Sequence, residues 1–384
     1  MKFSRLIFAN LFRKKMRFGL TIGSFAVALF LFAYLAVIRI AFTAAADIAG
    51  ADRLVVINRI SIIQPLPLAY RDRMLKMKGV KDVTFDNWFG GVYKDERSGF
   101  FPQFAIDIEN QRKVFPEFKV PDEQWNVFAK DRQGAIVGAA TAKKFGWKIG
   151  DRVPIKGTIF AGEWDFNIDG IYHVGKQGGD ETQFWFHWDY LQESIPAVSV
   201  WKGKAGWYTV RVSDPDDAPR IVKAIDAEFA NSPFETHTDT EKAFTTNWLK
   251  QFGNIKLLIM SIGTVVFFTL LLVTGNTMAI AVRERTSELA VLKALGYSDR
   301  FVLFFVLTES LAISALGGGA GLLLAKLCVV AFGDPTHGML PMFYLPWNAL
   351  LLGVAATLAV GIVSGLLPAI SAMRLRVVDA LRRV

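Results

Sequence analysis

The sequence predicts a membrane protein with four transmembrane helices and a large extracytoplasmic α+β domain between helices 1 and 2. The chain is 52% hydrophobic and only 21% charged, with a mean hydropathy of +0.31, a composition that is rare in soluble domains. Four stretches are long and apolar enough to cross a bilayer, and a long segment of mixed pattern separates the first from the second. These observations favour a multi-pass membrane protein with one large domain outside the bilayer.

The four apolar stretches each exceed the roughly 20 residues that a membrane-spanning helix requires. They are residues 18–42, 257–282, 301–332 and 347–373. Their length predicts tilt, or extension beyond the bilayer. The first could instead be a signal peptide, because Ala44–Ala46 resembles a cleavage site. Its apolar region is longer than the roughly 7–15 residues of a signal-peptide core, which favours a membrane anchor.

Lysines and arginines in the short flanks predict the orientation of the chain. They gather in residues 1–17, 283–300 and 374–384, whereas residues 333–346 contain none. We therefore expect both termini and the second loop in the cytoplasm, with residues 43–252 and the short loop 333–346 outside it. Basic residues beside apolar stretches are typical of membrane flanks, so we expect membrane lipid and no nucleic acid as a partner.

The segment 43–252 mixes helical and strand-like patterns and is long enough to bury its own core. Its pattern predicts an α+β domain, with two subdomains expected. The predicted strands lie at 80–85, 164–174 and 206–212, and the predicted helices at 67–78, 141–145 and 218–229.

No catalytic or metal-binding pattern is found in the sequence. The nearest match to a phosphate-binding P-loop runs from Gly170 to Gln177, but glutamine stands where a magnesium-binding hydroxyl is needed. The four histidines lack metal-ligand spacing, and a lone Cys328 excludes an intramolecular disulfide. His187 lies in an aromatic run that predicts a packed strand or a surface patch, with ligand contact as the alternative. We expect no catalytic residue, no metal and no directly bound cofactor.

Charged and small residues inside the predicted spans suggest helix contacts. Glu309 and Lys326 lie in the third span, where ionisable groups are costly and often functional. Proton relay is conceivable for Glu309, but a lone acid is more typical of a structural hydrogen bond between helices. The pair Gly19 and Gly23, and the run 317–321, permit close helix approach. The spacing of Gly19 and Gly23 fits either dimerisation or packing within one subunit.

A short charged helix is predicted directly after the second span. It is rich in charge at its start, carries Leu289, Leu292 and Leu295, and is closed by Gly296. Its acids, Glu284 and Glu288, argue against an anionic lipid surface. Docking in a groove of a protein partner is the better interpretation.

Three sequence blocks resemble the FtsX/MacB-type ABC transporter permeases, the mechanotransmission permeases. They are Ala9–Thr21; Val282–Gly296 together with Glu309-Ser310 and the glycines 317–321; and Gly365–Arg374 with the ending 380–382. Within the outer segment, residues 142–153 are similar to the MacB-like periplasmic core. The sequence departs from the family pattern at Val377, where proline is common, and at Ala290, where glycine is common; both positions bear on the fit to the ATPase.

The resemblance implies a non-enzymatic permease subunit in the bacterial inner membrane. It implies a second permease copy or paralogue, two cytoplasmic ABC ATPase subunits that hold ATP and magnesium, and a periplasmic adaptor of the membrane-fusion type. Closure of the ATPases would move the periplasmic domain and thereby export or extract an amphipathic or lipidic cargo. The alternatives are lipoprotein extraction and a signalling module that activates a cell-wall hydrolase.

Position by position, the resemblance makes residues 283–300 a coupling helix seated on the ATPase. It implies that the charged residues contact the rim of a groove while Leu289 and Leu292 fill it, and that residues 1–17 form an amphipathic helix along the cytoplasmic interface. The ATPase-coupling residues expected from it are Glu284, Arg285, Glu288, Leu289, Leu292, Lys293 and Gly296. The C-terminal family motif falls on Gly365, Pro368 and Arg374.

Overall fold

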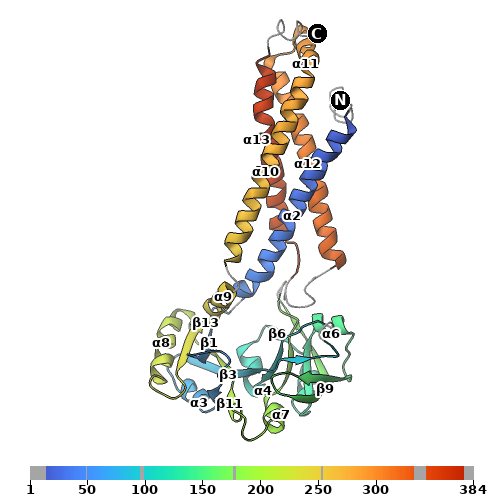
Figure 1. Ribbon diagram of the computed structural model, residues 1–384. Helices are drawn as coiled ribbons and strands as arrows, with labels where there is room; N and C mark the ends of the chain where they lie inside the picture. The colour runs from blue at the N-terminus through green and yellow to red at the C-terminus, as the bar shows by residue number, and fades with distance from the viewer. Residues whose placement is uncertain are drawn as a thin grey trace. The chain divides into compact units, whose positions relative to one another are not determined.

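The computed structural model describes residues 14–48, 50–95, 99–175, 179–251, 254–332 and 343–375. The chain forms two compact units, a helical unit (Met1–Ile40, Asn254–Gly333 and Phe343–Val384) and an outer domain (Ala41–Gly253 with Asp334–Met342) (Figure 1). Most of the predicted N-terminal helix 1–17, the loop 333–346 and the tail 374–384 lie outside the described residues.

The described part of the helical unit contains four long helices: α2 (Lys15–Ile48), α10 (Ile255–Glu284), α12 (Asp299–Phe332) and α13 (Trp347–Met373). Each contains a stretch long and apolar enough to span a membrane. The predicted spans fall within these helices, and α2 continues six residues past the end of its apolar stretch. A fifth helix, α11 (Thr286–Ala294), follows α10 directly.

Glycines let α2, α12 and α13 approach one another closely. A side chain at Gly321 of α12 would collide with the carbonyl oxygen of Ala26 in α2. On α13, a side chain at Gly361 would collide with Ser314, and the Ser310 hydroxyl donates to the Gly361 carbonyl oxygen at 2.7 Å. Through these contacts α12 packs closely against both α2 and α13.

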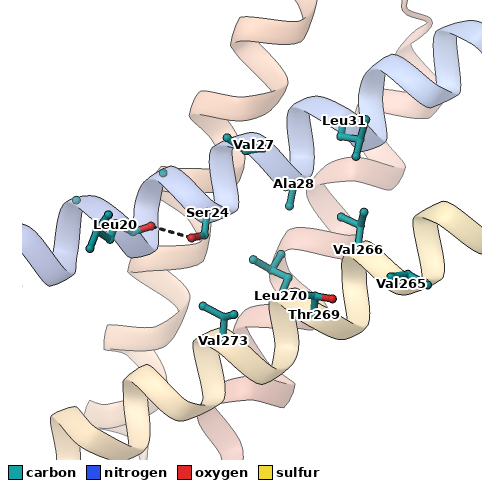
Figure 2. Close-up of a pocket in the computed structure, with 12 residues that line it drawn as sticks. Leu20, Ser24, Val27, Ala28, Leu31, Val265, Val266, Thr269, Leu270 and Val273 are labelled. Atoms are coloured by element: carbon teal, nitrogen blue, oxygen red, sulfur yellow. Dashed lines mark hydrogen bonds between the residues drawn. The ribbon is translucent and has the colours of Figure 1, made fainter.

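An apolar groove of about 600 Å³ separates α2 from α10 (Figure 2). Among the described residues, none approaches within 4 Å of the space where a side chain at Gly19 or Gly23 would lie. Within the part of the chain that the structure describes, these two glycines therefore do not pack against another helix. Ser24, on the same wall, turns its hydroxyl to the Leu20 carbonyl oxygen at 2.9 Å. The groove is lined by Gly19, Leu20, Gly23, Ser24, Val27, Ala28, Leu31, Val265, Val266, Thr269, Leu270 and Val273.

The outer domain is built on one eleven-stranded sheet with the order β13-β1-β12-β3-β5-β10-β7-β9-β8-β4, and β6 pairs with β9. The strands are β1 (Arg53–Asn58), β3 (Val80–Trp88), β4 (Gly91–Val92), β5 (Gln103–Ile106), β6 (Phe118–Lys119), β7 (Gly134–Gly138), β8 (Arg152–Gly157), β9 (Gly162–Val174), β10 (Phe184–His187), β12 (Trp207–Val212) and β13 (Thr236–Thr240). A separate pair joins β2 (Leu66–Pro67) to β11 (Lys204–Ala205).

Eight short helical segments accompany the sheet among the described residues of the outer domain. They are α3 (Tyr70–Leu75), α4 (Ile108–Val114), α5 (Asp122–Phe128), α6 (Ala139–Phe145), α7 (Trp188–Ser194), η2 (Pro215–Asp217), α8 (Ala218–Glu228) and α9 (Glu241–Gln251). The predicted helix 67–78 is shorter than expected because Leu66 and Pro67 pair with β11 before the helix begins.

The two expected subdomains share a single sheet. Antiparallel pairing of β3 with β5, in which Asn87 lies opposite Ala105, joins the two halves. One half buries an apolar core around Tyr208 and Ile225, and the other buries aromatic cores around Phe186 and Trp185. Burial alternates along β8, where Val153 and Ile155 face inward, as expected for a strand with one buried face.

Candidate coupling site

The candidate site lies at the end of the helical unit where α10 stops and α11 begins. Arg285 separates the two helices, with φ −110° and ψ 17°, outside the helical range. The Thr286 hydroxyl donates to the Arg283 carbonyl oxygen at 2.8 Å. A side chain from the first residue of α11 thus adds a hydrogen bond at the C-terminal end of α10.

Gly296 ends α11 by adopting a left-handed conformation with φ +92°. Its N–H donates to the Lys293 carbonyl oxygen at 3.0 Å, and the Tyr297 N–H donates to the Leu292 carbonyl oxygen at 3.2 Å. This pair of hydrogen bonds is the Schellman C-cap, for which glycine is preferred. The predicted closure of the helix by Gly296 therefore has a backbone cause.

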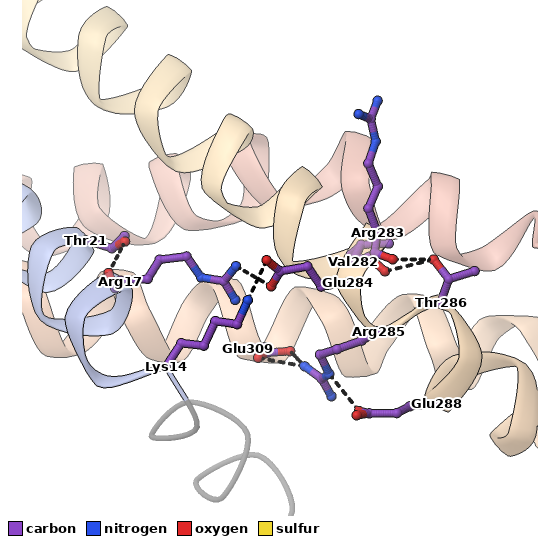
Figure 3. Close-up of polar contacts among 10 residues, drawn as sticks. All are labelled: Lys14, Arg17, Thr21, Val282, Arg283, Glu284, Arg285, Thr286, Glu288 and Glu309. Atoms are coloured by element: carbon purple, nitrogen blue, oxygen red, sulfur yellow. Dashed lines mark hydrogen bonds and ion pairs between the residues drawn. The ribbon is translucent and has the colours of Figure 1, made fainter. Parts of the chain in front are cut away.

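Arg285 connects α11 to α12 through a buried ion pair (Figure 3). Its Nη1 donates to both carboxylate oxygens of Glu309, at 2.9 and 2.8 Å, and its Nε donates to Glu288 at 3.2 Å. The side chains of Arg285 and Glu309 are only 13% and 9% exposed. The guanidinium also lies over the ring of Phe305 at 5.7 Å. A buried charge is tolerated when it is paired and hydrogen-bonded in this way.

Lys293 connects α11 to the end of α13. Its buried ammonium group donates to the carbonyl oxygens of Met373 at 2.5 Å and Leu375 at 2.9 Å, and pairs with Asp299 at 2.7 Å. A cation at the C-terminus of a helix satisfies free carbonyl groups and interacts favourably with the helix dipole.

Glu284 connects the end of α10 to the start of α2. Its carboxylate accepts hydrogen bonds from Lys14 at 2.6 Å and Arg17 at 2.7 Å (Figure 3). The Glu284 side chain is 37% exposed, so solvent and salt screen these pairs and each contributes little stability. The three links place the described ends of α2, α10, α12 and α13 at one end of the helical unit.

These contacts change the interpretation of the predicted ATPase-coupling residues. Leu289 is 2% exposed and belongs to the apolar core of the helical unit, and the half-buried Leu292 packs against that core. Contrary to expectation, Leu289 therefore has no surface to offer a partner's groove. The physical reason is that α11 packs its leucine face against its own chain. Arg285 and Lys293 point inward for the same reason.

A different face of α11 is exposed, and sequence reasoning named only Leu295 among its residues without separating it from the leucine face. Ser287, Val291 and Leu295 follow one another at helical spacing of four, and Leu295 is 72% exposed. Ala294, in the last turn of α11, and Tyr297, which follows the Gly296 cap, are also exposed. We call these five residues the outer α11 face. The i, i+4, i+8 spacing of Ser287, Val291 and Leu295 could have indicated this face from the sequence. The leucines Leu289 and Leu292 also follow a helical spacing, so the sequence alone does not tell which face is exposed.

The remaining predicted residues lie within α12 and α13. Lys326 holds its ammonium group 4.6 Å from the ring centroid of Trp347, a cation–π contact. A side chain at Gly365 would press on Ser310, Pro368 is buried inside α13, and Arg374 caps the end of that helix. These residues shape the α12–α13 contact, and only Arg374 lies at the end of the bundle where α11 lies.

His187 in the outer domain is a buried core residue. Its Nε2 lies 2.6 Å from the Phe128 carbonyl oxygen, its ring packs on Phe128, and burial lowers its pKa. Gly170–Val174 of the P-loop-like stretch lies in β9, whereas Lys176 and Gln177 fall outside the described residues. Within the described ranges, no three His, Cys, Asp or Glu side chains are grouped as metal ligands.

Among the described acids of the outer domain, Asp86, Asp107 and Asp169 are buried and have raised pKa values, and the shift is large for Asp86 and Asp169. Burial, reinforced by the neighbouring Asp107 carboxylate, raises the pKa of Asp86 to about 8. Burial and the nearby Asp131 raise the pKa of Asp169 to about 6. Asp86 Oδ1 and Asp169 Oδ2 have no hydrogen-bond partner among the described residues. Loss of hydration is the larger cause in both cases.

Two protein families match this sequence. The family described as MacB-like periplasmic core domain matches residues 18–228, more than half of the chain. The family described as FtsX-like permease C-terminal matches residues 260–377, which include α11 and its contacts on α12 and α13.

The similar proteins are ABC transporter permeases. An uncharacterized ABC transporter permease of Methanocaldococcus jannaschii is 24% identical over 338 residues, 83% of this chain and 81% of that protein. The macrolide export ATP-binding/permease protein MacB of Bordetella avium is 30% identical over 181 residues, 46% of this chain and 27% of that protein. The chain thus spans about a quarter of that MacB. The solved periplasmic region of MacB from Actinobacillus actinomycetemcomitans aligns with a TM-score of 0.38 and 13% identity, over 52% of this chain and 93% of that one.

Proposed function

Because this chain belongs to the FtsX/MacB-type ABC transporter permeases, we propose that it couples ATP hydrolysis in separate cytoplasmic ATPase subunits to movement of its outer domain. In this proposal ATP and magnesium bind only to the ATPases, and the chain itself is not an enzyme. The basic residues near the described ends of α2, α10 and α13 support a cytoplasmic location for that end of the bundle. The outer domain then lies in the periplasm of an inner-membrane protein.

The outer α11 face is the single observation that carries the proposal. Val291 and Leu295 expose apolar side chains at the end of the bundle, while buried Arg285 and Lys293 fix α11 to its own chain. A helix held from behind and apolar in front suits the groove of a protein partner. Glu284 and Glu288 would then face water or the rim of that groove.

We propose that the permease acts as a dimer in which the groove between α2 and α10 receives α2 of a second copy. The groove is apolar, and the open positions at Gly19 and Gly23 leave room for another helix to approach closely. A homodimer also provides two coupling helices for two ATPases.

We propose that the cargo is amphipathic or lipidic and is exported or extracted, with a periplasmic adaptor as the receiving partner. The MacB relative is named for macrolide export, which supports an apolar or amphipathic cargo here.

Co-purification with the genomically adjacent ABC ATPase tests the docking step. The tagged full-length chain is compared with Leu295→Asp and Val291→Asp, which place a charge on the outer α11 face. The matched control is Ile60→Asp, because Ile60 is at least as exposed as Leu295 and Val291 but lies in the outer domain. We expect the first two substitutions to reduce ATPase recovery more than tenfold and the control to leave it unchanged. Failure of the unsubstituted chain to retain any ABC ATPase would overturn the permease proposal.

A further inference from the structure

We infer that Arg285 and Glu309 form the link that transmits movement of α11 to α12, and that neither residue contacts the ATPase. Both act as positioning residues. The inference rests on the proposed function, since it assumes that an ATPase moves α11. It assigns Arg285 a role different from the ATPase contact that the family resemblance implies, and it gives a function to the interhelical contact that was expected of Glu309.

The location of Arg285 is the first argument. Arg285 lies at the break between α10 and α11, where the backbone leaves the helical conformation. Two separate helices can change their relative angle at such a break, unless side chains restrain them. Arg285 supplies the restraint by pairing forward with Glu288 in the first turn of α11 and sideways with Glu309 in α12.

The geometry of the pair is the second argument. One guanidinium nitrogen reaches both oxygens of Glu309 at 2.8 and 2.9 Å, and both side chains are almost fully enclosed. An ion pair shielded from water resists separation far more than an exposed pair of the same length. A displacement of α11 therefore moves Arg285, and the ion pair moves Glu309 and α12 in the same direction.

The contrast with the other links is the third argument. Glu284 is paired as closely, with Arg17 at 2.7 Å, but it is 37% exposed. Salt and water weaken that contact, so it holds α2 only loosely to the end of α10. Lys293 holds the end of α13 through backbone oxygens, which no substitution on α13 can remove. The Arg285–Glu309 pair can be removed from either side and restored by exchanging the charges.

A distance measurement in the assembled complex tests the link. The full-length chain with Cys328→Ala carries spin labels at Val198→Cys in the outer domain and Val330→Cys in α12, both highly exposed positions. The complex with the adjacent ATPase is measured in nanodiscs with and without ATP. We expect the Glu309→Gln chain to retain the ATPase. The ATPase in that complex should hydrolyse ATP within about twofold of its rate with the parent chain. The ATP-dependent change in the distance between the labels should fall by more than half.

Controls separate this inference from the proposed function. Arg17→Gln removes an equally close but exposed ion pair, at 2.7 Å, and is expected to leave the distance change intact. The exchange Arg285→Glu with Glu309→Arg is expected to restore it. If Glu309→Gln does not fold, Arg285→Met with Glu309→Leu replaces the pair by apolar side chains, a change that buried ion pairs commonly tolerate.

Each outcome has one meaning. A full ATP-dependent distance change in Glu309→Gln or in the apolar double variant overturns the link. No ATPase binding by the parent chain overturns the proposed function instead. Loss of ATPase binding in Glu309→Gln alone would assign Glu309 to docking and equally overturn the inference.

Discussion

The ammonium group of Lys293 lies 2.5 Å from the carbonyl oxygen of Met373, so a side chain of α11 caps the end of α13. This contact makes the position of α11 depend on α13 as well as on α12. Residues that are 80 apart in the chain are thereby fixed to one another.

Replacing Lys293 by methionine is expected to destabilise the helical unit by about 1–3 kcal/mol, because two carbonyl oxygens lose their donor. Cys328 in α12 is the only cysteine of the chain, so the rate of its reaction with a maleimide during heating reports unfolding of this unit. The control is Asp299→Asn, which removes only the exposed partner of Lys293. Equal melting of Lys293→Met and the parent chain would show that the cap contributes no stability.

Gly321→Ala is expected to destabilise the helical unit by about 1–3 kcal/mol through overpacking. The added methyl group would collide with the Ala26 carbonyl oxygen and push α2 from α12. Gly319→Ala is the matched control, because the described residues leave open space there. Alanine favours a helix over glycine by up to about 1 kcal/mol, so the control should be neutral or stabilising in the same maleimide assay.

The stability of the outer domain is expected to fall as pH rises through the titration of Asp86. Its pKa in the folded chain is about 8, above the value of about 4 for an unfolded aspartate. Between these values the folded chain keeps a proton that the unfolded chain has released. The contribution of protonated Asp86 to the stability of the outer domain is therefore fully present below about pH 4 and is lost as the pH rises to 8.

Asp86→Asn is expected to remove this dependence. At pH 8 its free energy of unfolding should exceed that of the parent chain by about 1–3 kcal/mol, so it should unfold at a higher temperature. This difference in stability should shrink toward pH 5. Tryptophan fluorescence reports this domain, since Trp347 is the only one of the ten tryptophans outside it. Glu123→Gln, at an exposed position, is the control, and parallel curves for Asp86→Asn and the parent chain would contradict the prediction.

A dimer that seats α2 in the groove predicts a cross-link at Val27. In a Cys328→Ala background, Val27→Cys should form a disulfide-linked dimer on mild oxidation, because Val27 is exposed on the groove wall. Phe304→Cys, exposed on α12 away from the groove, should remain monomeric under the same conditions. Equal cross-linking at both positions would indicate random collision in the membrane.

The four long helices were predictable because an apolar run of sufficient length is helical in lipid whatever its neighbours are. The strands at 164–174 and 206–212 were predictable from local alternation, and they correspond to β9 and β12. Their union into one sheet was not, because the β3–β5 pairing joins segments whose register depends on the folded domain.

The orientation of α11 could not be read from its sequence for a related reason. Leu289 and Leu292 define one apolar side, and Val291 and Leu295 define another. Only packing against α12 decides which side is buried. Likewise, Glu309 was recognised as a charged residue within an apolar span, but its partner Arg285 lies 24 residues earlier and beyond the reach of local pattern.

The order of strands in the outer domain has a consequence for crowding in the cell envelope. The sheet ends at β4, which has two residues, and at β13, whose sequence is Thr-His-Thr-Asp-Thr. An edge so short, or so polar, is a poor template for strand addition by a neighbouring chain. Many copies of the domain can therefore be held at high local concentration on a membrane surface without their sheets joining edge to edge.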